Sequence, residues 1–173
     1  MIFLDTCVWF ELVGVRTPVK QHEIQQAIAA STLLNKILEN QEEIITCKEQ
    51  LVELISAVEK ATMKEASRER KNKQLPGIGN LKDFRKLDEF QQTKQLCRTI
   101  INDVKHFAKV HTIGEYDIDN IIQHLDLVDI NDHLYCDFCM KATVDFYTFD
   151  SDVKGLGEHL NIHYYQVDKQ QWS

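Results

Sequence analysis

Short apolar runs alternate along the chain with longer stretches whose apolar residues recur at helical spacing. MIFLD (1–5) and EEIIT (42–46) are brief and apolar, and polar residues bound them, which is typical of buried strands in a parallel sheet. IHYYQV (162–167) has the same character, and VDFYTFD (144–150) predicts a strand that runs into a turn. The pattern therefore predicts at least four short strands.

The segments between these strands have the 3.6-residue apolar period of helices. Pro18 suits the first turn of one helix, and Asp117 can cap another. Strands separated by helices imply right-handed crossovers, so we predict a three-layer α/β/α fold with a central, mostly parallel sheet of four or five strands. The predicted helices cover residues 19–40, 48–61, 87–111, 117–125, 131–143 and 152–160.

The middle of the chain differs in character from the rest. MKEASRERKNKQLPGIGN (63–80) is basic at first and then contains the turn residues of a loop, LPGIGN. The length of 173 residues suits one domain of ordinary size. We therefore predict a single domain over 1–173 that carries a helical and partly basic insertion at about 62–110.

Composition and charge exclude several classes of protein. No apolar run approaches the roughly 20 residues of a membrane span, and we expect no membrane association and no signal peptide. Five cysteines are an odd number, which favours the reducing cytoplasm. The net charge of −7 argues against binding nucleic acid by bulk attraction. A nuclease remains compatible with that charge if its acids cluster around metal ions.

Acidic residues stand at corresponding ends of the predicted elements. Asp5 ends the first strand, and Asp150 and Asp152 follow a later one. Glu53 lies early in the helix after the second strand, and Asp132 begins another helix. Strand carboxyl ends and helix amino ends meet at one edge of a parallel sheet, where the functional crevice lies.

Carboxylates gathered at that edge would need a cation. At an effective dielectric near 20, each close pair of carboxylates costs on the order of 3–4 kcal/mol. Mg²⁺ and Mn²⁺ prefer carboxylate oxygens, and two such ions can activate a water and stabilise the leaving oxygen of a phosphodiester.

Each acid also has an ordinary interpretation. Asp5 and Asp132 can cap helices, Glu53 can lie on the wet face of an amphipathic helix, and Asp150 and Asp152 can be turn residues. Four acids at matching positions of alternating elements are less easily explained in this way. The combination favours a metal site.

The order of these motifs resembles that of the PIN-domain ribonucleases. The resemblance rests on three segments, FLDTCVWFEL (3–12), IITCKEQLVEL (44–54) and DINDHLYCDFCMKATVDFYTFDSDV (129–153). In that family a strand ends in Asp followed by Ser or Thr, a helix carries Glu-Leu, a later helix begins with Asp, and a strand ends in Thr-x-Asp-x-Asp. Asp5-Thr6, Glu53-Leu54, Asp132 and Thr148-Phe149-Asp150-Ser151-Asp152 fit this order.

The resemblance implies an endoribonuclease that cleaves single-stranded or looped RNA with one or two Mg²⁺ or Mn²⁺ ions. It implies that Asp152 is an outer metal ligand and that the hydroxyls of Thr6 and Thr148 orient carboxylates or phosphate. The catalytic residues and metal ligands that it implies are Asp5, Glu53, Asp132 and Asp150.

The resemblance also has implications for partners. Many compact members are toxins of toxin–antitoxin pairs, in which a small protein blocks the site, and they commonly form homodimers. The alternative is a non-catalytic module of the same fold that binds RNA or protein. That alternative predicts that the four carboxylates diverge or pair with Lys and Arg.

Two further features have open interpretations. The basic stretch can hold an RNA backbone through Lys64, Arg68, Arg70 and Lys71, or it can be a solvated helix face. Cys136 and Cys139 form a C-x-x-C in a predicted helix, with no second pair that would complete a zinc site. We therefore expect this pair to be structural.

Overall fold

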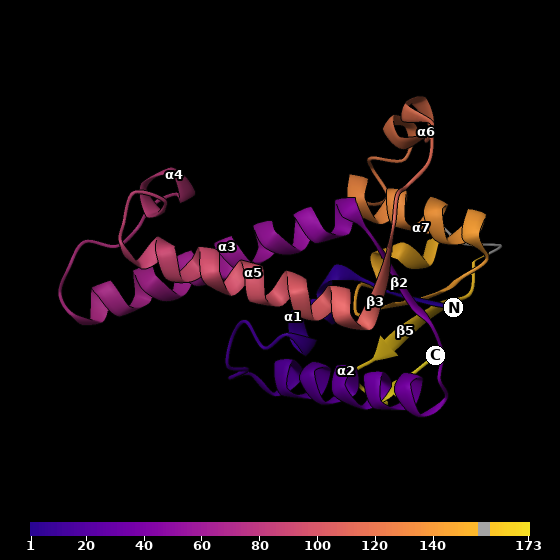
Figure 1. Ribbon diagram of the computed structural model, residues 1–173, viewed down its shortest axis with the longest axis horizontal. Helices are drawn as coiled ribbons and strands as arrows, with labels where there is room; N and C mark the ends of the chain where they lie inside the picture. The colour runs from indigo at the N-terminus through magenta and orange to yellow at the C-terminus, as the bar shows by residue number, and fades with distance from the viewer. Residues whose placement is uncertain (156–159) are drawn as a thin grey trace.

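A six-stranded sheet lies between two layers of helices in the computed structural model, which describes residues 1–155 and 160–173 (Figure 1). The first five strands in chain order run parallel to one another, and the last is antiparallel to the fifth. The spatial order is β3-β2-β1-β4-β5-β6. The strands are β1 (Ile2–Leu4), β2 (Ile44–Cys47), β3 (Ala108–His111), β4 (Asp145–Thr148), β5 (Ile162–Gln166) and β6 (Gln171–Trp172).

The helices vary widely in length. The longest, α3 (Lys48–Asn72), follows β2 without a break. The others are α1 (Thr6–Leu12), α2 (Gln21–Glu39), α4 (Leu81–Phe84), α5 (Glu89–Phe107), α6 (Ile118–Gln123) and α7 (Ile130–Ala142), and a 3-10 turn, η1, covers Asp152–Gly155. Among the described residues, none of these helices combines the length and apolar character needed to cross a membrane.

The alternation of side chains along β1 divides the interior into two cores. Ile2 and Leu4 face one layer, where they pack with residues of α1, α2, α3 and α5. Phe3 faces the other, where it packs with Tyr135 and other residues of α6 and α7. Because helices cover both faces of β1, this strand is apolar throughout, which is why it reads as a continuous apolar run.

The strand order reverses at β1. The chain moves outward from β1 through β2 to β3, and then crosses to the other side of β1 for β4, β5 and β6. In open parallel sheets the functional crevice lies outside the carboxyl ends of the strands at such a reversal. Here that position is occupied by the residues that follow β1 and β4, which begin with Asp5 and Phe149.

The predicted fold class is confirmed, but several element boundaries were wrong. The predicted helix over 87–111 ends at Phe107, and residues 108–111 form β3, which pairs with β2. The helix predicted over 48–61 continues to Asn72. Of the predicted helix over 152–160, residues 152–155 form the 3-10 turn and residues 156–159 lie outside the described residues. The sheet therefore exceeds the predicted four or five strands through β3 and β6.

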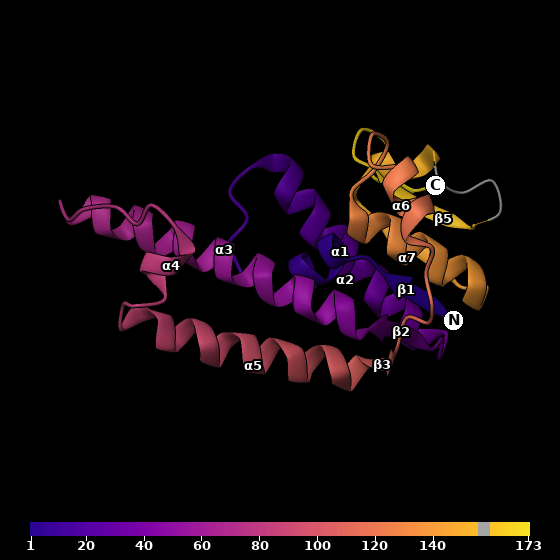
Figure 2. The same ribbon diagram turned by 90° about the horizontal axis from the view of Figure 1, so that it is seen from above.

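The predicted insertion corresponds to a helical hairpin. α3 and α5 lie side by side and extend well beyond the sheet, with α4 near the far end (Figure 2). Arg85 binds Glu59 through two hydrogen bonds of 2.8 and 2.6 Å, and Thr93 donates to Thr62 at 3.2 Å. These contacts fix α4 and α5 against α3, because they tie residues far apart in sequence.

Candidate active site

Asp5 is a buried carboxylate at the point where β1 ends and α1 begins. It is the N-cap of α1 and accepts a hydrogen bond from the backbone N–H of Thr6. The Thr148 hydroxyl donates to its Oδ2 atom at 2.6 Å, and the Cys7 thiol donates to the same atom at 3.0 Å. Burial raises the pKa of Asp5 to about 6, although the hydrogen bonds from Thr148 and Cys7 oppose this shift.

Glu53 projects from the second turn of α3 toward Asp5. The hydroxyls of Thr6 and Tyr135 both donate to its Oε2 atom, at 2.6 and 2.7 Å. These two bonds join α3 to α1 on one side of the sheet and to α7 on the other. Tyr135 is fully buried, and burial raises the pKa of its hydroxyl, which therefore remains a hydrogen-bond donor.

A buried glutamine fixes the position of the first turn of α3. The Nε2 atom of Gln50 donates to the carbonyl oxygen of Leu4 at 2.8 Å, and its Oε1 atom accepts from the Thr46 hydroxyl at 2.7 Å. Gln50 and Thr46 are both fully buried. Because Glu53 lies almost one turn further along α3, this link sets its distance from Asp5 at the end of β1.

Asp132 reaches the same edge from the other helix layer. Asp129, not Asp132, is the N-cap of α7, and it accepts from the backbone N–H groups of Asn131 and Asp132 at 3.0 and 3.2 Å. The capping interpretation of Asp132 is therefore wrong. Its pKa is raised to about 8, first by burial and then by the negative charges of Asp5, Asp129, Asp150 and Glu53.

Asp150 and Asp152 follow β4 in a tight turn. The backbone N–H of Asp150 donates to the Thr148 hydroxyl at 2.9 Å, and the Asp150 Oδ1 atom accepts from the backbone N–H of Asp152 at the same distance. Asp150 is exposed and acts electrostatically on Asp132. Asp152 begins the 3-10 turn, and its Oδ1 atom lies 3.4 Å from the Ser151 hydroxyl.

Asp5, Glu53, Asp132 and Asp150 thus come from four separate segments to the same edge of the sheet, where burial, and then the negative charges of the other three, raise the pKa of Asp132. Across residues 1–155 and 160–173, no Lys, Arg or His forms an ion pair with any of these four side chains. In the same residues, no three His, Cys, Asp or Glu side chains stand close enough as a group to hold a metal ion.

The chemistry of this donor set fits a hard divalent cation. The cluster consists of carboxylate oxygens, which Mg²⁺ and Mn²⁺ prefer, and hydroxyl groups orient two of the carboxylates. The raised pKa values of Asp5 and Asp132 indicate that burial, and then neighbouring negative charge, makes it costly for these groups to ionise without a counterion. A bound cation would remove that cost.

Sequence reasoning missed four residues that support the cluster: Cys7, Gln50, Asp129 and Tyr135. Tyr135 and Gln50 stand within apolar helical patterns, where one polar side chain resembles an ordinary core position. Burial and the nearby charge of Asp5 raise the pKa of Cys7, so its thiol is a neutral donor to Asp5. A capping signal was present for Asp129, which precedes an apolar residue at the start of α7.

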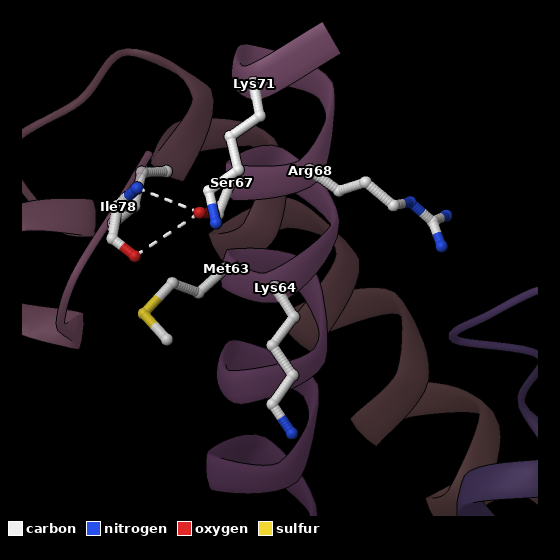
Figure 3. A pocket seen from close by; sticks show the side chains of 6 residues that line it. All are labelled: Met63, Lys64, Ser67, Arg68, Lys71 and Ile78. Carbon is white, nitrogen blue, oxygen red and sulfur yellow. Dashed lines mark hydrogen bonds between the residues drawn. The ribbon is translucent and has the colours of Figure 1, made fainter. Parts of the chain in front are cut away.

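The predicted RNA-binding residues do not all share one surface. Lys64, Arg68 and Lys71 line a groove of about 310 Å³ on α3 together with Met63, Ser67 and Ile78 (Figure 3). The guanidinium of Arg70 is instead engaged by the Pro76 carbonyl at 3.1 Å and by Glu89 at 3.5 Å. Arg70 therefore holds the loop after α3 and the start of α5.

Cys136 and Cys139 are both buried in the core between the sheet and α7, where they are free thiols. Burial raises the pKa of Cys136 to about 12, so this thiol is protonated at neutral pH. Their packing supports the structural role expected from the sequence.

Comparison of the chain with models of known protein families finds no match, and comparison with characterised proteins finds none.

Proposed function

We propose that this protein is a metal-dependent endoribonuclease of the PIN type. One observation carries the proposal. Four carboxylates from four segments share the carboxyl edge of the sheet at the strand-order reversal, and their mutual repulsion helps to raise the pKa of Asp132 to about 8. Such a cluster is costly to the fold unless a cation occupies it. The rival interpretation, a non-catalytic module, predicts acids that diverge or pair with basic residues, and among the described residues none of the four acids pairs with Lys, Arg or His.

The proposed ligands of one or two Mg²⁺ or Mn²⁺ ions are Asp5, Glu53, Asp132 and Asp150, with Asp152 as an outer ligand. When bound, such an ion lowers the pKa of a water and neutralises charge on the phosphate. The chain's own contribution is to hold the oxygens in place. Thr148 orients Asp5, and Thr6 orients Glu53, through charge-assisted hydrogen bonds of 2.6 Å.

The decisive experiment compares RNA cleavage by the parent and by Asp5→Asn. Single-stranded and stem–loop RNAs are incubated with Mn²⁺ or Mg²⁺, and with EDTA. We expect cleavage by the parent only with metal, and none by Asp5→Asn, whose melting temperature should stay at or above that of the parent because a buried acid is replaced by a neutral amide. Asp103→Asn, at an exposed position of α5, is the matched control and should cleave normally. Equal cleavage by Asp5→Asn and the parent would refute the proposal.

A protein partner that blocks the site is part of this proposal, as in a cytoplasmic toxin–antitoxin pair. What supports it is a run of exposed apolar side chains around α6, next to the start of α7: Tyr116, Ile118, Ile122, Leu125, Leu127 and Ile130. Asp117, Asp119, Asp126 and Asp129 surround this run, so the complementary partner is a basic, amphipathic segment.

The test of the partner requires a small protein that is encoded beside this chain and that inhibits RNA cleavage by the parent. Ile122→Glu combined with Leu127→Glu should escape inhibition while RNA cleavage persists. Inhibition equal to that of the parent would contradict docking at α6. The homodimer that the family resemblance implies is tested separately by light scattering of the purified chain.

A further inference from the structure

The charges of α3 are segregated around the helix axis. At 3.6 residues per turn, Lys60, Lys64 and Lys71 lie within about 20° of the direction of Glu53. Beyond Glu53, the acids of this helix, Glu59, Glu65 and Glu69, all lie on the opposite half by the same geometry. One side of α3 is therefore free of negative charge from the active site to its far end. We call Lys60, Lys64 and Lys71 the basic ridge.

The basic ridge leads directly away from the candidate active site. A rise of about 1.5 Å per residue places Lys60, Lys64 and Lys71 about 10, 16 and 27 Å beyond Glu53 along the axis. All three lysines are exposed. Because α3 extends beyond the sheet as one uninterrupted helix, these distances are fixed by the helix itself (Figure 2).

The three lysines of the basic ridge are not engaged in ion pairs within the described residues, so their charges can interact with a ligand. Among the described residues, the ion pairs of α3 involve Glu59, Glu65, Arg68 and Arg70, and none involves Lys60, Lys64 or Lys71. Arg68 differs, because both oxygens of Glu65 lie 2.6 Å from its guanidinium. In a protein with a net charge of −7, a line of unpaired lysines beside an acidic site requires an explanation.

The groove at the far end of the ridge has a defined shape. The backbone N–H of Ile78 donates to the Ser67 hydroxyl at 2.9 Å, which holds the loop after α3 against the helix. A Cβ atom on Gly77 would lie 2.7 Å from the Cε atom of Lys71, so the loop passes directly over that side chain. The Lys64 side chain runs along α3 toward its amino end, and therefore toward Glu53 (Figure 3).

We propose that the basic ridge binds the phosphate backbone of single-stranded RNA and leads it from the groove to the carboxylates. This inference rests on the proposed nuclease function and adds a substrate requirement to it. A stacked strand carries one phosphate every 3.4 Å, so about 27 Å corresponds to about eight nucleotides. The efficient substrate is thus a single-stranded segment that extends about eight nucleotides to one side of the cut.

Binding is tested without turnover, in EDTA, with fluorescein-labelled oligouridylates of 4, 8 and 12 nucleotides. We expect the affinity to rise from 4 to 8 nucleotides and then to level off. Each phosphate contact contributes about −0.7 to the slope of log K against log salt for single strands. Lys64→Ala combined with Lys71→Ala should therefore reduce the slope by about 1.4 and weaken binding of the 12-mer about 25-fold at 0.1 M salt.

The matched control is Lys73→Ala combined with Lys82→Ala. It removes the same charge from exposed positions of the same hairpin that lie off the ridge, so it should bind the 12-mer as the parent does. We call the Lys64→Ala, Lys71→Ala protein the ridge variant. If it and the control variant bind the 12-mer with equal affinity and equal salt dependence, the inference is overturned. The inference is also overturned if the parent binds the 4-mer and the 12-mer with equal affinity.

The cutting pattern links the ridge to the active site. With Mn²⁺, the parent should cut an end-labelled 12-mer mainly about eight nucleotides from one end, whereas the ridge variant should cut at scattered positions. The same scattered cuts by the parent would overturn the inference. A parent that shows ridge-dependent binding but no metal-dependent cleavage would refute the nuclease proposal alone, so the two failures are distinguishable.

Discussion

The hydroxyl of Tyr135, on α7, donates a hydrogen bond of 2.7 Å to the Oε2 atom of Glu53, on α3. The two residues belong to helices on opposite faces of the sheet, and they meet at its carboxyl edge. This contact makes the position of a proposed metal ligand depend on both helix layers. Thr6 donates to the same oxygen, so two hydroxyls fix the rotation of one carboxylate.

Tyr135→Phe should reduce RNA cleavage about 10–100-fold, the usual effect of removing a hydrogen bond that orients a metal ligand. The ring stays in place, so the loss should show in Mn²⁺ affinity and in kcat rather than in folding. Both are measured by titrating the cleavage rate with Mn²⁺. Tyr116→Phe, at an exposed tyrosine, should behave as the parent. Unchanged Mn²⁺ dependence in Tyr135→Phe would show that the bond does not position Glu53.

Without divalent metal, the protein should lose stability as the pH rises. Asp5 and Asp132 have pKa values of about 6 and about 8 in the folded protein, above the 3.8 of an ordinary Asp. The folded state therefore binds these protons more tightly than the unfolded chain, and raising the pH from about 4 to 8 favours unfolding.

Thermal melts in EDTA should show this loss as a fall of several degrees Celsius between pH 5 and pH 8.5, since about 1 kcal/mol shifts Tm by about 2–4 °C at this size. Asp132→Asn should flatten the decline, because it removes the group with the larger shift. A Tm that is level or rises over this range in the parent would contradict the assignment of the shifts.

Mn²⁺ should stabilise the protein, and more strongly at pH 8 than at pH 6. Carboxylates must lose their protons before they bind a cation, so affinity rises as Asp5 and Asp132 ionise. Ligand binding to the folded state alone raises Tm with concentration. The measurement is a melt at both pH values over a range of Mn²⁺ concentrations. Asp5→Asn should lose most of the shift, whereas Asp103→Asn should retain it.

Gln50→Leu should destabilise the fold although it adds apolar surface. The change leaves the Leu4 carbonyl and the Thr46 hydroxyl, both buried, without their partner. Each unsatisfied buried group costs about 1–3 kcal/mol, so urea denaturation should show a loss of about 2–4 kcal/mol. Gln92→Leu, at an exposed position of α5, is the control and should change stability little. If Gln50→Leu and the parent unfold at the same urea concentration, the link between β1 and α3 contributes nothing to the stability of the fold.

Local signals in the chain determined much of the fold. The apolar runs before Asp5 and Asp150 became β1 and β4, and Asp117 caps α6 as predicted, accepting from the backbone N–H of Asn120. The strand and helix termini also predicted that Asp5, Glu53 and Asp132 lie at one edge, and in the structure the charges of Asp5 and Glu53 act on Asp132. These features are readable because burial between two helix layers requires apolar strands, and caps require particular side chains.

Other features were decided only by tertiary structure. Residues 108–111 continue a helical pattern, yet they form β3 because β2 offers them a hydrogen-bonding partner. Tyr135 and Gln50 acquire their roles only when α7 and α3 meet the sheet. Periodicity and capping act between residues that are close in the chain. The contacts of Glu53, and the pKa of Asp132, depend on distances between segments that only the packed molecule brings together.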